Sequence, residues 1–108
     1  MLDNNTAIII SQRYFAGVIG FYKAIADEPR IGATHISLYM ALFQQCYKKQ
    51  FQSPFDITRR ELMELAKISG RATYHKCMKD LVDCGFIKYL PSCNPALKSQ
   101  VFLNIVWH

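Results

Sequence analysis

Residues 58–87 constrain the fold of this chain most, because they carry the start and stop signals of two short helices. Thr58 and Glu61 have the T-x-x-E spacing of a capping box, which satisfies free backbone N–H groups where a helix begins. The apolar residues of the helix that follows share one face: Leu62, Leu65 and Ala66. Ile68 is then expected in a tight turn.

A second helix is predicted over residues 69–84, because the Ser69 hydroxyl can accept a free backbone N–H as an N-cap. Its apolar residues recur at helical spacing and form one stripe: Tyr74, Met78, Leu81 and Val82. The opposite face is mostly cationic: Arg71, Ala72, His75, Lys76 and Lys79. Gly85 suits the left-handed residue that ends a helix, and a strand is expected from Phe86.

An apolar stripe backed by a basic stripe meets the two needs of a DNA recognition helix. One side must anchor in a small core while the other meets phosphates and base edges. The pattern also describes an amphipathic helix whose charged face is merely solvated. The short first helix, the tight turn and the strand pair after Gly85 favour nucleic-acid binding over that simpler interpretation.

The segment ITRRELMELAKISGRATYHKCMKDLVDCGFIKYL resembles the winged helix-turn-helix of bacterial and phage transcriptional regulators. The residues that match that frame are Leu65, Ala66, Ser69, Arg71, Thr73, Leu81, Gly85, Phe86 and Ile87. The preceding ISLYMALFQQCYKKQ is similar to the first helix of this domain in phage replication-initiator and mobile-element proteins. The resemblance covers about residues 36–103 and implies that the helix 69–84 enters the major groove.

The expected fold is mainly α with a small β-hairpin, a winged helix-turn-helix with an extra N-terminal helix in one domain, residues 1–108. The N-terminal helix is predicted over residues 11–28, capped by Ser11. The winged part is predicted over residues 33–108. Its remaining elements are a helix over 33–49, a short strand over 55–57 and a wing over 86–107, with strands 86–90 and 101–107 and a turn over 91–100.

The N-terminal helix carries more apolar surface than one side of a helix can bury. The residues expected to pack inward are Phe15, Val18, Ile19 and Tyr22, and those expected outside are Tyr14, Phe21 and Ile25. An exposed apolar patch of this kind usually marks an interface, and Gly17 and Gly20 would allow close approach, so a homodimer is predicted. The alternative is a monomer in which the second helix and the strand after Pro91 cover this helix.

The charge is uneven: residues 58–108 hold eight Lys/Arg against four Asp/Glu, a net of +4 out of +5 for the whole chain. This excess lies where phosphate contacts with double-stranded DNA are expected. The predicted DNA-contacting residues are Arg59, Arg60, Ser69, Arg71, Ala72, Thr73, His75, Lys76, Lys79, Lys88 and Lys98. Lys88 and Lys98 in the wing are equally well explained as ordinary solvated lysines.

The sequence favours no catalytic or metal site. Its four cysteines, Cys46, Cys77, Cys84 and Cys93, form no C-x-x-C motif and no zinc-finger spacing with histidine. They are expected to be buried free thiols of a cytoplasmic protein. No carboxylate pair, phosphate-binding loop or activated nucleophile stands out, so neither enzyme activity nor a cofactor is expected. No stretch approaches the length of a membrane span.

Three functions remain open. The first is a sequence-specific transcriptional regulator of a bacterium or mobile element, acting as a homodimer. The second is a DNA-binding accessory of replication or element transfer, which the similarity of residues 36–50 suggests. The third is a protein-interaction module, because winged helices also serve in that role.

Overall fold

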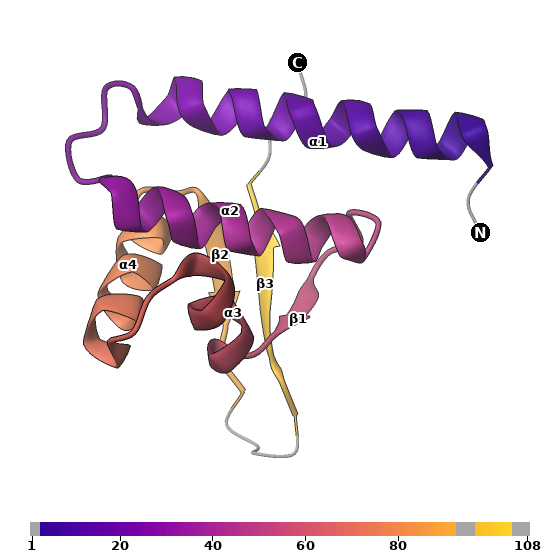
Figure 1. Cartoon of the computed structure of the whole chain (residues 1–108). Coiled ribbons are helices and arrows are strands. Elements are labelled where there is room, and N and C mark those ends of the chain that lie inside the picture. Colours follow the sequence, from indigo (N-terminus) through magenta and orange to yellow (C-terminus); the bar gives the residue numbers. More distant parts are fainter. Residues whose placement is uncertain (1–2, 93–96, 105–108) are drawn as a thin grey trace.

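The computed structural model describes residues 3–92 and 97–104, which form four helices and a three-stranded antiparallel sheet (Figure 1). The helices are α1 (Asn4–Ile25), α2 (Ala33–Lys48), α3 (Arg59–Ala66) and α4 (Arg71–Asp83). The strands are β1 (Phe55–Ile57), β2 (Ile87–Leu90) and β3 (Ser99–Leu103). A mainly helical domain with a small β-hairpin is therefore confirmed, and none of the described helices is long and apolar enough to cross a membrane.

Helix α2 is the centre of the core. It is apolar on nearly every side, and α1 packs against one side while α3 and α4 pack against the others (Figure 1). The largest side chains that are fully buried come from α2, α3, α4 and β3: Leu38, Tyr39, Leu42, Phe43, Leu62, Leu81 and Val101. Burial on several sides explains why the apolar residues of α2 do not form a single stripe.

Local signals place the ends of α3 and α4. The Thr58 hydroxyl accepts the Glu61 N–H at 3.3 Å, as predicted, but the Glu61 carboxylate accepts from that hydroxyl at 3.1 Å. Gly85 follows α4 with φ of +81°, and the Phe86 N–H donates to the Leu81 carbonyl at 3.0 Å. This is the Schellman pattern that a glycine favours. Lys67 ends α3 in the same left-handed region, with φ of +62°.

The prediction that Ser69 caps the second helix is wrong. The N-cap is Gly70, whose extended backbone (φ −99°, ψ 130°) begins α4 at Arg71, and no side chain caps it. Ser69 therefore lies one residue outside the helix. The chain first turns at Lys67 and buries Ile68, so the helix starts one residue later than the hydroxyl signal suggested.

Helix α1 is longer than predicted and turns its other face to the core. It begins at Asn4, capped by the Asp3 carboxylate, which accepts the Thr6 N–H at 2.6 Å. Phe21, expected outside, is buried and stacks on Tyr39 with 3.7 Å between ring centroids. The other core-packing residues of α1 are Tyr14, Val18 and Ile25, whereas Phe15, Ile19 and Tyr22 are exposed. Only Val18 of the predicted inward set packs inward.

The sheet has the strand order β1-β3-β2, with the hairpin strands β2 and β3 adjacent. Val101 lies opposite both Phe55 and Tyr89, and Ile87 lies opposite Leu103. Strand β1 has the predicted bounds, but β2 begins at Ile87 and β3 begins at Ser99, so the predicted turn over 91–100 is shorter. The parts of the predicted wing at residues 93–96 and 105–107 lie outside the described residues.

Candidate nucleic-acid interface

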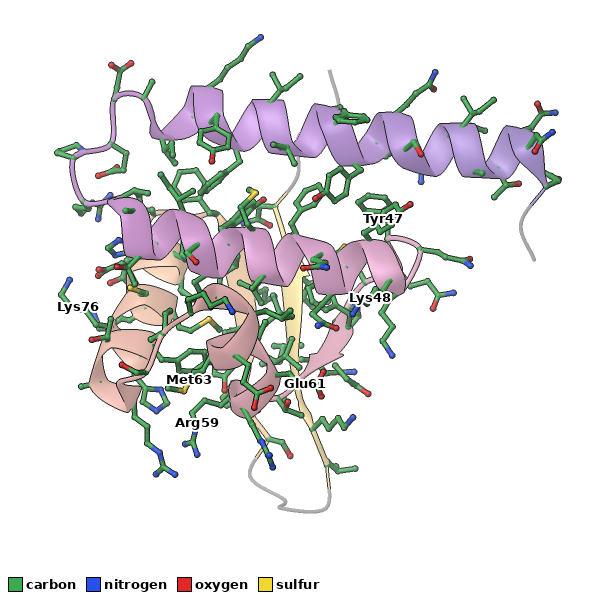
Figure 2. The ribbon with its side chains drawn as sticks, viewed as in Figure 1. Tyr47, Lys48, Arg59, Glu61, Met63 and Lys76 are labelled. Atoms are coloured by element: carbon green, nitrogen blue, oxygen red, sulfur yellow. The ribbon has the colours of Figure 1, made fainter. Side chains whose placement is uncertain are left out.

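Three elements reach the end of the molecule that lies farthest from α1. The N-termini of α3 and α4 both point to this end, and the β2–β3 hairpin extends past them (Figure 1). Arg59 lies at this end (Figure 2), in the first turn of α3. Arg71 occupies the first turn of α4. The fold therefore gathers two helix starts, each with an exposed arginine, beside one hairpin.

Helix α4 separates its two faces mostly as the sequence predicted. The exposed residues are Arg71, Ala72, Thr73, His75, Lys76 and Lys79. The buried residues are Tyr74, Cys77, Met78 and Leu81. Val82 of α4 and Leu65 of α3, which the pattern placed on the apolar faces of their helices, are exposed. Cys77, which lies outside the predicted stripe, is buried.

Both lysines on the exposed face of α4 already have carboxylate partners. Lys76 Nζ lies 2.9 Å from Asp80 Oδ2, and Lys79 Nζ lies 2.9 Å from Asp83 Oδ2. Each pair has the i, i+4 spacing that brings side chains together on a helix. These partners raise the pKa of each lysine, so both ammonium groups stay charged. The net positive charge of this face is lower than a list of its lysines implies.

His35 joins the start of α2 to α4. Its ring is buried, and Nδ1 accepts the Gly32 N–H at 3.1 Å. The proton therefore sits on Nε2, which donates to Asp80 Oδ2 at 2.7 Å. The hydrogen bond from His35, followed by that from Lys76, holds the pKa of Asp80 at about 2. Asp80 is thus an anchor for α4 as well as the partner of Lys76.

Arg59 and Arg71 are the exposed arginines of this end without a carboxylate partner among residues 3–92 and 97–104. Arg60 differs, because its Nε lies 3.5 Å from Glu64 Oε1, although exposure of both side chains makes this pair weak. Burial raises the pKa of Tyr74 to about 12, and Arg59 acts in the opposite direction.

The two lysines of the predicted wing have different surroundings. Lys88 Nζ lies 5.8 Å from the centre of the Phe102 ring, within cation–π range. The two residues are opposite each other in the β2–β3 pairing, in the part of the hairpin away from its turn. Lys98 is exposed and directly precedes β3, so it lies near the turn. Of the two, Lys98 is nearer the end where Arg59 and Arg71 lie.

The sequence did not indicate a groove between α4 and β2. It has a volume of about 320 Å³ and is lined by Tyr74, His75, Met78, Lys79, Val82 and Tyr89. Two of its apolar side chains, Val82 and Tyr89, are partly open to solvent. The groove runs beside the exposed face of α4, so a molecule bound to that face would also meet it.

The described residues contain no group of three His, Cys, Asp or Glu side chains that could hold a metal ion. Cys46 and Cys77 are buried free thiols, as predicted, and burial raises the pKa of Cys46 to about 11. Cys84 is only partly buried, and Cys93 lies outside the described residues. A high thiol pKa makes Cys46 a poor nucleophile.

The sequence matches no protein-family model, and comparisons with curated proteins and with solved structures give no match either.

Proposed function

We propose that this chain binds double-stranded DNA as a winged helix-turn-helix, with α4 in the major groove. The order α2–β1–α3–α4–β2–β3 and the strand order β1-β3-β2 support this proposal. The observation that carries it is the placement of Arg71, which is exposed and without an ion pair in the described residues, in the first turn of a helix anchored to the core. The first turn of a recognition helix lies deepest in the groove.

The roles of the cations follow from their positions. A guanidinium bound to both acceptors of a guanine discriminates by about 1–3 kcal/mol against the wrong base, which suits Arg71. Arg59 and Arg60 begin α3, where backbone N–H groups and arginine together attract a phosphate. Lys76 and Lys79 would exchange their carboxylate partners for phosphates, which reduces their contribution to affinity.

Within this class of function, we propose a sequence-specific transcriptional regulator of a bacterium or mobile element. An accessory of replication or element transfer would use the same surface, and the bound DNA distinguishes the two. Selection of bound sites from random sequence should yield a palindrome for a regulator, because operator symmetry mirrors protein symmetry. A non-palindromic motif would favour the accessory.

A gel shift at several salt concentrations tests DNA binding directly. Affinity should fall as salt rises, because bound phosphates release their counterions. Absence of a shift at low salt with every DNA pool would reject the proposal and leave a protein-interaction module.

Arg71 provides the sharper test, with Arg71→Lys beside Arg71→Ala. Lysine keeps the charge but loses the planar fork, so it should retain most of the salt slope while relaxing the selected motif. Arg71→Ala should relax the motif and weaken binding as well. If both variants lose affinity equally on every sequence, Arg71 makes no base-specific contact.

A further inference from the structure

The outer face of α1 carries a second apolar stripe that nothing in the described residues covers. Ile8, Phe15, Ile19 and Tyr22, with 54%, 64%, 53% and 48% of their surfaces exposed, share this face with exposed Gln12. Successive members of this set are alternately four and three residues apart. This is the spacing by which two helices interlock along a seam.

The first half of α1 packs against few residues of the rest of the chain. Tyr14 contacts Phe43 and Tyr47 near the end of α2, with 5.0 Å and 5.1 Å between ring centroids. The helix before Tyr14 therefore extends beyond α2 (Figure 1), and both Ile8 and Ile9 are about half exposed. Helices in proteins gain most of their stability from packing an apolar face against other elements. The first half of α1 therefore lacks a packing partner for its apolar side chains.

Two open grooves, each of about 450 Å³, lie on either side of Phe15. One is lined by Ser11, Tyr14, Phe15, Gln44 and Tyr47. The other is lined by Asn4, Ala7, Ile8, Ser11, Gln12 and Phe15. Phe15 and Ser11 belong to both, so the most exposed aromatic ring of α1 stands between two hollows that can receive side chains of a second helix.

We propose that a second copy of this chain covers this stripe, with the two α1 helices antiparallel and Phe15 at the two-fold axis. Ile8 of one copy then faces Tyr22 of the other, and each overhanging half lies along the better-supported half of its partner. A two-fold pair uses the same patch twice, as this stripe allows. The proposal is independent of DNA binding.

The charges of α1 favour the antiparallel arrangement. A parallel pair in register would place Arg13 level with Arg13 and Lys23 level with Lys23 along the axis. In the antiparallel pair, Arg13 is level with Gly17 of the partner and Lys23 is level with Ala7, one helical turn from Asp3. Like charges therefore lie at different heights along the pair, and Lys23 of each copy lies one helical turn from the level of the partner's Asp3.

The available area fits a dimer of modest affinity. A large side chain buries about 150–250 Å² in full, so five half-exposed ones give roughly 450 Å² per copy, and residues at the rim add more. Both copies together then reach about 1,000 Å², the lower bound for a specific interface. A dimer of this size is expected to dissociate within the micromolar range.

Light scattering over a micromolar dilution series tests the association. The native chain should approach about 25 kDa, twice the 12.5 kDa of one copy, and Phe15→Glu with Ile19→Glu should stay at 12.5 kDa. Leu97→Glu is the matched control, because Leu97 is equally exposed at 64% but lies in the segment between β2 and β3. Circular dichroism of each variant should be measured to verify that it is folded. A native mass of 12.5 kDa at every concentration, or a dimer that survives both substitutions, would overturn the proposal.

Cross-linking tests the direction of the helices, in a background with Cys84→Ser and Cys93→Ser. When Ile8→Cys and Tyr22→Cys chains are mixed and oxidised, an antiparallel pair yields the mixed 8–22 disulfide. Links of 8 to 8 and 22 to 22 without the mixed product would show a parallel pair and reject the arrangement.

Discussion

His35 Nε2 donates to Asp80 Oδ2 over 2.7 Å, and this hydrogen bond joins the first turn of α2 to the last third of α4. The same carboxylate oxygen accepts from Lys76 at 2.9 Å. The start of α2 and the exposed face of α4 are therefore connected through one side chain. This connection fixes how α4 presents its first turn, where Arg71 lies.

The Asp80 carboxylate should make stability depend on pH in the acid range. Its pKa in the folded chain is about 2, because His35 and Lys76 stabilise the charged form, whereas an unfolded aspartate has a pKa of about 3.9. Between these values the unfolded chain binds more protons, so the free energy of unfolding falls as pH drops from about 4 to 2. Above about pH 4 the full contribution is present.

Denaturant unfolding at pH 6 and at several values below pH 4 checks this. Asp80→Asn should lower stability at pH 6, and the difference from the native chain should shrink toward pH 2. Asp27→Asn, at an exposed carboxylate after α1, is the control and should leave the slope unchanged. A constant difference between the native chain and Asp80→Asn at every pH would contradict the assigned role.

Replacing Gly85 should lower the stability of the chain because of its backbone conformation, and not because a new side chain would meet its neighbours. Its φ is +81°, and a Cβ built there meets nothing within 4 Å. Gly85→Ala should destabilise the chain by about 1–2 kcal/mol, the cost of the left-handed region for an L-residue. Asn tolerates this region better, so Gly85→Asn should fall between the two. Thermal unfolding of the three chains gives the order, and equal values for Ala and Asn would reject the backbone explanation.

Signals that act over a few residues made part of this structure predictable. Thr58 caps α3 and Gly85 ends α4 as the sequence indicates, because both motifs are complete within six residues. The bounds of β1 follow from the Ser53-Pro54 break before Phe55. The buried positions Tyr74, Met78 and Leu81 follow from helical spacing.

Features of the structure that depend on contacts between residues far apart in the sequence could not be predicted from local signals. Helix α1 has two overlapping apolar stripes, and contacts with distant residues, such as Phe21 with Tyr39 and Tyr14 with Phe43, decide which one faces the core. The partner of His35 lies 45 residues away, so periodicity cannot reveal it. The local spacing explains only the other contact of His35, since a side chain three residues after Gly32 can accept the Gly32 N–H.

Releasing Lys79 from its partner should strengthen DNA binding. Asp83 Oδ2 lies 2.9 Å from Lys79 Nζ, and both side chains are exposed, so the pair is not needed for folding. Asp83→Asn removes the negative charge and should raise both the affinity and the salt slope. Asp27→Asn adds the same charge outside α4, in the loop that follows α1, and should change neither as much. Equal gains from the two variants would show only an effect of net charge.

The final prediction concerns the two arginines at the start of α3. Arg59 and Arg60 are exposed where Thr58 begins the helix, and a phosphate at this position would meet backbone N–H groups and guanidinium groups together. Replacing both with Ala should weaken binding on all sequences alike and reduce the salt slope by about 1–2, since each lost phosphate contact changes it by about 0.9. Lys48→Ala with Lys49→Ala is the matched control: this adjacent pair removes the same charge from the end of α2, apart from Arg59 (Figure 2). Gel shifts across a salt series measure both slopes, and equal slopes for the two double variants would show that the arginines are only solvated surface.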